Sequence, residues 1–189
     1  AIGDPLVKLL KQKAGKIKVG PGDGEGVEMG PLVTRAHRDK VAGYIDTGVA
    51  EGAKLVLDGR NKKIADHENG FFLGTTLFDQ VKPGMTIYKD EIFGPVLIVL
   101  RADTLEEAIA LVNANPYGNG TAIFTNSGGA ARRFEEEVQV GMVGVNVPIP
   151  VPMAFYSFGG WKDSLFGDLH MHGVEGVKFH TRTKVVTTR

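Results

Sequence analysis

The sequence predicts an α/β fold. An open, mostly parallel sheet with flanking helices is expected over residues 1–166, and an extended arm over residues 167–189. Short apolar segments alternate with helical patterns between residues 96 and 147, which is typical of parallel strands joined by right-handed crossovers. Prolines then stand at positions 148, 150 and 152, which excludes helix and favours extended chain. The last residues alternate apolar and basic side chains, as a strand with two different faces does.

Two helices are expected in the first sixty residues. Asp4-Pro5 is typical of a helix start, with aspartate at the cap, and Gly15 of a helix end. Thr34 can cap a second helix, in which apolar residues recur every four positions at Val41, Ile45 and Val49. The segments around these helices predict a strand over 16–19, a glycine-rich loop over 20–30 and a strand over 54–58.

The middle of the chain supplies the elements of the parallel sheet. The aromatic and threonine-rich run Phe71–Phe78 predicts a strand, and the apolar run Val96–Leu100 predicts a strand buried on both faces. Thr104 and Glu107 form a capping box at the start of the next helix. Further along the chain, the pattern predicts a strand over 121–124, a helix over 130–138 and a strand over 143–147.

The C-terminal alternation is open to two interpretations. Residues 177, 179, 181, 183 and 185 would share one face of a strand, and basic residues with a histidine the other. Such a strand is either an arm that pairs with another subunit or an edge strand of the same domain, protected by lysine and arginine.

Composition excludes several function classes. The formal net charge is zero, so the chain has no electrostatic footprint for nucleic acid or for an anionic membrane surface. No apolar run approaches the roughly 20 residues of a membrane span, and the first residues do not resemble a signal peptide, which favours a cytoplasmic setting. The chain contains no cysteine, so it has neither a disulfide nor a thiolate nucleophile of its own. It also lacks an initiating methionine, so residue 1 is expected to lie inside a longer chain.

Three local patterns are weak candidates for functional sites. The glycines of residues 20–30 fit neither dinucleotide nor nucleotide phosphate motifs, which favours a plain connector. Asp168, His170 and His172 alternate like metal ligands, but a hydrogen-bonded loop explains them as well. His37 is expected on a helix surface.

The segment that precedes the predicted strand at Val96 is a stronger candidate site. A carboxylate there, Glu91, could accept hydrogen bonds from ribose hydroxyl groups, and Phe93 could pack against a flat ring. An exposed or capping glutamate is the alternative interpretation.

Several motifs in order resemble the aldehyde dehydrogenase superfamily. Residues 91–96 read E-I-F-G-P-V, and residues 158–164 read F-G-G-W-K-D-S. Between them, Glu106-Glu107-Ala108-Ile109, Tyr117-Gly118 and Ala122-Ile123-Phe124-Thr125 match in order and spacing, so the resemblance covers nearly the whole chain. It implies the α/β catalytic domain of that superfamily.

Within the superfamily, the chain most resembles the CoA-acylating branch, the methylmalonate-semialdehyde dehydrogenases. Asn119 stands where most hydrolytic relatives have leucine, and Ser157 where they have proline. The resemblance implies an aldehyde substrate, NAD as cofactor, CoA as co-substrate, and propionyl-CoA or acetyl-CoA as product with loss of CO2. Glu91 and Phe93 would bind the nicotinamide side of the cofactor, and Ile149, Pro150 and Phe158 would line the aldehyde pocket.

The resemblance also implies what the chain lacks. The nucleophilic cysteine of the family would lie shortly before Ala1, so the chain would be the C-terminal part of the enzyme and inactive alone. The complete enzyme would be a homo-oligomer, a dimer or a tetramer, assembled through the arm. The alternatives are a hydrolytic aldehyde dehydrogenase and a non-catalytic assembly module.

Overall fold

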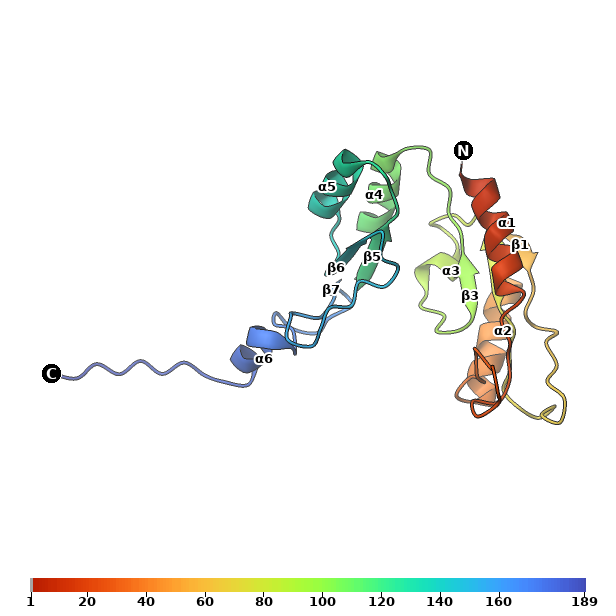
Figure 1. Cartoon of the computed structure of the whole chain (residues 1–189), viewed down its shortest axis with the longest axis horizontal. Helices are drawn as coiled ribbons and strands as arrows, with labels where there is room; N and C mark the ends of the chain where they lie inside the picture. Colours follow the sequence, from red (N-terminus) through yellow and green to blue (C-terminus); the bar gives the residue numbers. More distant parts are fainter. Residues whose placement is uncertain (1) are drawn as a thin grey trace. The chain divides into compact units, whose positions relative to one another are not determined.

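The computed structural model describes residues 2–189, which form two compact units. One unit runs to Arg101 and the other spans Ala102–Arg189. Figure 1 labels the helices and strands of both units. The division differs from the boundary expected after residue 166, which falls inside the second unit.

The first unit packs helices against a small mixed sheet. Strand β2 (Thr76–Asp79) is central and fully buried, and it pairs antiparallel with β1 (Lys54–Leu57) and parallel with β3 (Val96–Ile98). Three helices complete the unit: α1 (Gly3–Ala14), α2 (Arg35–Ala50) and the short α3 (Thr86–Lys89). The core is built by Val41, Ile45, Ala53, Leu73, Phe78, Val81, Met85, Ile87 and Ile92.

The second unit has a parallel strand pair with two helices and an irregular C-terminal region. Strands β5 (Gly120–Ile123) and β6 (Met142–Val145) are parallel, and β4 (Tyr117–Gly118) pairs antiparallel with β7 (Trp161–Lys162). The helices are α4 (Leu105–Ala114), α5 (Gly128–Glu137) and α6 (Gly173–Phe179). Its core consists of Ile109, Phe134, Val138 and Val140.

The helix caps predicted at Thr34 and Thr104 are confirmed. The Thr34 hydroxyl accepts a hydrogen bond from the His37 amide at 3.1 Å, and Thr104 accepts one from the Glu107 amide at 3.1 Å. The Glu107 carboxylate accepts in return from the Asp103 amide at 2.8 Å, one residue before the position that a capping box uses.

Three local predictions were wrong. Helix α1 begins at Gly3, so Asp4 lies in its first turn and pairs with Arg101 instead of capping. Residues 16–19 form only an isolated bridge between Val19 and Met29. Val49, expected on the buried face of α2, is 46% exposed, whereas its neighbour Gly48 is buried against Ile87 and Phe78.

The single open sheet was also wrong, although the mixed α/β class is confirmed. The described residues form three small sheets, and β3 pairs only with β2. The apolar run Val96–Leu100 is therefore not buried on both faces, and Leu97 is 48% exposed. Alternating strand and helix patterns predict parallel pairing, which β5 and β6 show, but they do not specify which strands share a sheet.

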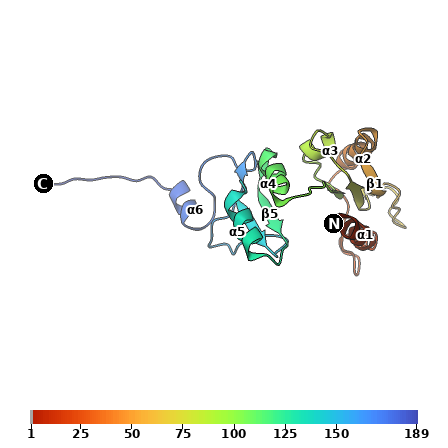
Figure 2. The ribbon, with the colours of Figure 1, turned by 90° about the horizontal axis from the view of Figure 1, so that it is seen from above.

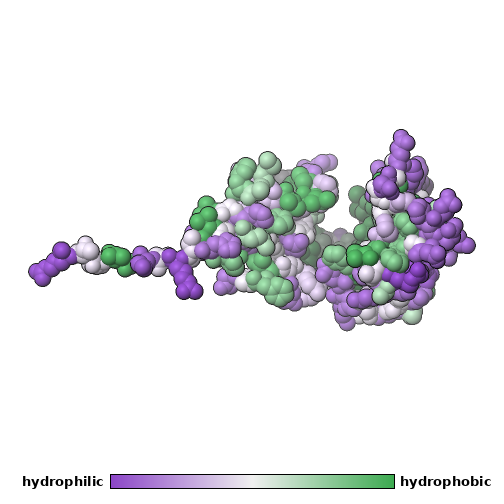
Figure 3. Space-filling model, turned by 90° about the horizontal axis from the view of Figure 1, so that it is seen from below, coloured by the Kyte–Doolittle hydropathy of each residue, from purple (hydrophilic) through white to green (hydrophobic). Residues whose placement is uncertain are grey.

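The predicted C-terminal strand is replaced in part by helix. Val177 and Phe179 lie in α6, and residues 181–189 contain no helix or strand and are exposed. Figures 1 and 2 show this tail as extended chain beyond α6, and Figure 3 shows hydrophobic residues within it. Among residues 2–189, no helix combines the length and the apolar character that crossing a membrane requires.

Candidate functional site

The first candidate site is the segment Asp90–Pro95, which joins α3 to β3. One face of α2 holds it through residues spaced i, i+4 and i+7. The His37 ring nitrogen Nε2 lies 2.7 Å from the Phe93 carbonyl oxygen, and the Tyr44 hydroxyl donates to Asp90 at 2.9 Å. Between these two contacts, Val41 packs so tightly against Gly94 that an added Cβ would lie 2.7 Å from it.

The segment buries Ile92 and exposes the residues on either side of it. Ile92 is 8% exposed and belongs to the core, whereas Glu91 is exposed and Phe93 is 77% exposed. Within residues 2–189, the Glu91 carboxylate has no hydrogen-bond or ion-pair partner. A free carboxylate and a bare aromatic ring two residues apart are available to a ligand with hydroxyl groups and a flat ring.

Phe93 has an unusual backbone conformation. Its φ is +59°, in the left-handed region that bulky residues seldom adopt. Such strain persists only where surrounding contacts hold it, and it is concentrated at functional sites. The contacts that α2 makes with Asp90 and Gly94 can hold Phe93 in this conformation.

The hydrogen bond to Asp90 changes the acidity of Tyr44. Because the phenol donates to a carboxylate, the negative phenolate form is disfavoured and the pKa of Tyr44 is raised. The phenol therefore stays a hydrogen-bond donor to Asp90 at physiological pH.

The second candidate site lies in the other unit, after β6. Pro150 is half-buried over the parallel strand pair, with ring carbons close to Gly120 and Gly144, whereas Ile149 is 71% exposed. Phe158 makes an edge-to-face contact with the His172 ring at 5.4 Å between centroids. The predicted pocket residues therefore divide between the sheet surface and the region near α6.

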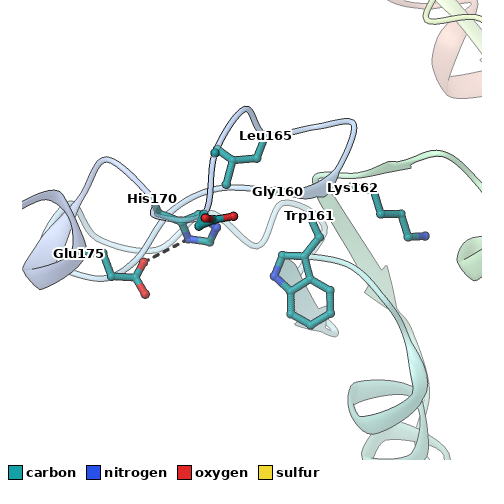
Figure 4. A pocket seen from close by; sticks show the side chains of 8 residues that line it. Gly160, Trp161, Lys162, Leu165, His170 and Glu175 are labelled. Atoms are coloured by element: carbon teal, nitrogen blue, oxygen red, sulfur yellow. Dashed lines mark ion pairs between the residues drawn. The ribbon is translucent and has the colours of Figure 1, made fainter. Parts of the chain in front are cut away.

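Ser157 joins two further polar side chains near a cavity. Its hydroxyl oxygen lies 2.6 Å from His170 Nδ1 and donates to Glu175 at 2.7 Å, and His170 lies 3.5 Å from Glu175. Figure 4 shows His170 and Glu175 at the edge of this cavity, whose volume is about 350 Å³. Lys162 also lines it, but its ammonium is committed to the carbonyls of Asn113 and Asn115.

Of the alternating Asp168, His170 and His172, only His170 makes a side-chain hydrogen bond, to Ser157, among the described residues. The His172 ring touches Phe158, and its Nδ1 is buried without a hydrogen-bond partner in residues 2–189. No group of three or more potential ligands able to hold a metal ion occurs in residues 2–189. Sequence reasoning missed the Ser157 contacts because its partners lie 13 and 18 residues further along the chain.

The aldehyde dehydrogenase family matches residues 1–186 of this chain. The chain belongs to that family. The family resemblance predicted from E-I-F-G-P-V and the loop at Phe158 is thereby confirmed.

Two relatives within the family have high sequence identity to this chain. Malonate-semialdehyde dehydrogenase of Pseudomonas aeruginosa is 60% identical over 188 residues. A probable acylating methylmalonate-semialdehyde/malonate-semialdehyde dehydrogenase of Drosophila melanogaster is 52% identical over 178 residues. The chain spans 38% of the length of the first relative and 34% of the second.

Solved aldehyde dehydrogenase structures agree with this. A putative methylmalonate-semialdehyde dehydrogenase from Sinorhizobium meliloti, complexed with NAD, aligns with 99% of the chain at a TM-score of 0.96 and 51% identity. The chain covers 38% of that structure. The enzyme from Oceanimonas doudoroffii aligns with 100% of the chain at a TM-score of 0.96 and 54% identity.

The roles expected for individual residues stay predictions. Glu91 and Phe93 lie in the first unit of this aldehyde dehydrogenase chain, and Ile149, Pro150 and Phe158 lie in the second. His37 is the functional candidate that sequence reasoning placed on a plain surface. The spacing of His37, Val41 and Tyr44 on one helical face was the signal that could have identified it.

Proposed function

We propose that the chain is part of an NAD-dependent, CoA-acylating dehydrogenase that converts malonate or methylmalonate semialdehyde to acetyl-CoA or propionyl-CoA. For malonate semialdehyde, the reaction consumes CoA and NAD+ and yields acetyl-CoA, CO2 and NADH. The aldehyde carbon is oxidised by loss of a hydride, and the carbon that carried the carboxylate gains a proton. NAD+, when bound, supplies the hydride acceptor.

The NAD assignment is supported by one observation: Glu91 and Phe93 are exposed on a segment whose backbone and flanking residues are fixed by contacts with α2. The unpartnered Glu91 carboxylate fits hydrogen-bond donors such as ribose hydroxyl groups. The exposed Phe93 ring fits one face of a flat nitrogen heterocycle. The segment is fixed before a ligand arrives, so less conformational freedom is lost on binding.

The second unit would contribute to the aldehyde pocket through Ile149, Pro150 and Phe158. Pro150 is anchored on the strand pair and Phe158 is steadied by His172, so both present apolar surface from fixed positions. Ser157 stands where most hydrolytic relatives have proline, and its two hydrogen bonds to His170 and Glu175 could not be made by proline.

The nucleophile would come from outside these 189 residues, since the chain contains no cysteine. The nucleophilic thiolate and the dinucleotide-binding fold are therefore assigned to the rest of the enzyme. This assignment is checked by sequencing the residues on both sides of the segment in the complete enzyme, where a cysteine is expected.

The test of the proposed function is the CoA dependence of the complete enzyme. Malonate semialdehyde and NAD+ are supplied with and without CoA, and acetyl-CoA, NADH and free acid are measured. We expect acetyl-CoA and NADH in equal amounts, and no sustained turnover without CoA. Free acid formed at the same rate in its absence would establish the hydrolytic alternative.

The homo-oligomer predicted from the sequence remains part of this proposal. Residues 181–189 are exposed and have no strand partner among residues 2–189, and Val185 and Val186 are 85% and 72% exposed. Extended chain of this kind can add to a sheet edge of another subunit. Deleting residues 177–189 from the complete enzyme should lower the mass measured by size exclusion with light scattering, and an unchanged mass would argue against the arm.

A further inference from the structure

We infer that His37 is a positioning residue for the NAD site: its hydrogen bond to the Phe93 carbonyl holds the backbone that presents Phe93 and Glu91. This inference rests on the proposed function of those two residues. His37 itself would act through the backbone and not by touching the cofactor.

The donor in this contact is defined by chemistry. A carbonyl oxygen can only accept, so His37 Nε2 carries a proton and donates across the 2.7 Å separation. The ring is placed by its own helix, because the Thr34 hydroxyl fixes the His37 amide at the first turn of α2. The imidazole itself is half-buried.

The Phe93 carbonyl depends on His37 more than its neighbours depend on any side chain. The Gly94 carbonyl accepts from the Val96 amide at 2.7 Å, and the Pro95 carbonyl accepts from the Thr76 amide at 2.8 Å. Both donors are backbone groups of the sheet region. Of these three successive carbonyls, only that of Phe93 is held by a side chain, and it follows the residue in the left-handed conformation.

The consequence of losing the bond follows from the strain. At a φ of +59°, Phe93 sits in a region that is unfavourable for a bulky residue. Without a donor on its carbonyl, the peptide after Phe93 can rotate towards ordinary extended geometry. The ring and the neighbouring carboxylate would then populate several orientations, and NAD would select only one of them, which weakens apparent affinity.

The experiment compares four variants of the complete enzyme: His37→Leu, His37→Gln, Glu91→Gln and His67→Leu. Leucine removes the donor and keeps an apolar side chain, whereas glutamine places an amide N–H where Nε2 stood. His67→Leu is the matched control, because it removes another histidine of the same unit, whose ring makes an edge-to-face contact with Phe72. The dissociation constant of NAD+ is measured by calorimetry, and the Michaelis constants for NAD+ and aldehyde by steady-state kinetics.

We expect His37→Leu to raise the dissociation constant of NAD+ by roughly three- to tenfold, as for one lost hydrogen bond, with the Michaelis constant for aldehyde unchanged. His37→Gln should restore affinity to within about twofold of the parent enzyme. A merely structural role would lower the melting temperature in both variants without this rescue, so melting curves without NAD are recorded alongside.

The outcomes separate the two proposals. If Glu91→Gln weakens NAD+ binding but His37→Leu does not, the positioning role is wrong and the proposed site stands. If His37→Leu and His37→Gln are equally weak, the donor is not what matters and the inference is overturned. If neither His37→Leu nor Glu91→Gln changes affinity, the cofactor assignment of this segment fails as well.

Discussion

At the scale of single residues, the firmest polar contact is between Arg101 and the buried Asp79. The Asp79 carboxylate is 3% exposed and accepts from Arg101 at 2.9 and 2.7 Å and from the Gln80 amide at 2.8 Å. Arg101 also reaches Asp4 of α1 at 2.9 Å, so one guanidinium joins the helix to the central strand. Removing the guanidinium would leave a buried carboxylate without its partner.

We therefore expect Arg101→Met to lower the melting temperature, because the buried Asp79 carboxylate loses its partner. Asp4→Asn is the matched control: the Asp4 carboxyl is 92% exposed, so its loss should cost less than about 1 kcal/mol. Thermal unfolding of the complete enzyme would measure both. Equal effects of the two substitutions would contradict the dominant role of Asp79.

The same pair predicts a pH dependence. The hydrogen bonds from Arg101 lower the pKa of Asp79 below its ordinary value near 3.9. Since the folded-state pKa lies below the unfolded-state value, the stabilisation is complete above about pH 4 and is lost as pH falls through the folded-state pKa. Asp79→Asn should flatten the fall in melting temperature in this acidic range, and an unchanged slope would show that other groups dominate.

At the scale of elements, α2 contains two glycines with opposite requirements. Gly43 is exposed, and a Cβ added there would meet no atom within 4 Å. Gly48 is buried, and a Cβ there would lie 2.9 Å from the Ile87 side chain and 3.1 Å from Phe78. The helix can therefore approach β2 and α3 only where it has no side chain.

Gly43→Ala should stabilise the protein by about 0.5–1 kcal/mol, because alanine loses less freedom in a helix. Gly48→Ala should destabilise it by about 1–3 kcal/mol through overpacking against buried side chains. The two variants differ by the same methyl group in one helix, so their melting temperatures should move in opposite directions. A stabilised Gly48→Ala would show that Ile87 and Phe78 rearrange at little cost.

Elements were predictable from the sequence where their signals are local. The hydroxyls of Thr34 and Thr104 accept hydrogen bonds from amides three residues later in the chain. This contact is made within one helical turn, so it does not depend on what the helix packs against. The partner of a strand depends on residues far away in the sequence. The sequence pattern therefore could not show that β3 and β5 belong to different sheets. The residues around Val177 and Phe179 are compatible with a strand and with a short helix, and packing against the rest of the chain decides which of these structures forms.

The candidate site followed the same rule. Glu91 and Phe93 were identifiable because their motif is contiguous, and the structure adds that both are exposed on a held segment. His37 and the Ser157 cluster were not identifiable, because each makes its contacts across 13 to 56 residues of sequence. A side chain that acts through a distant backbone group leaves no signature beside its partner.

At the scale of the whole molecule, the proposed function needs a nucleophilic thiolate that this chain does not contain. The chain has no cysteine and spans 38% of the length of a relative to which it is 60% identical. In the proposed reaction the hydride leaves only after a nucleophile has added to the aldehyde, so Glu91 and Phe93 would not start that reaction by themselves. Among residues 2–189, Ile149 and Phe166 are 71% and 98% exposed.

The isolated 189-residue chain should accordingly produce no NADH from malonate semialdehyde, NAD+ and CoA above the rate of a protein-free control. Adding the remaining portion of the enzyme as a separate polypeptide should restore turnover if the two portions associate. The same addition with its nucleophilic cysteine changed to alanine should not, which separates catalysis from simple stabilisation. NADH formation by the chain alone would mean that one of its own side chains activates the aldehyde, and the assignment of the nucleophile to the rest of the enzyme would be wrong.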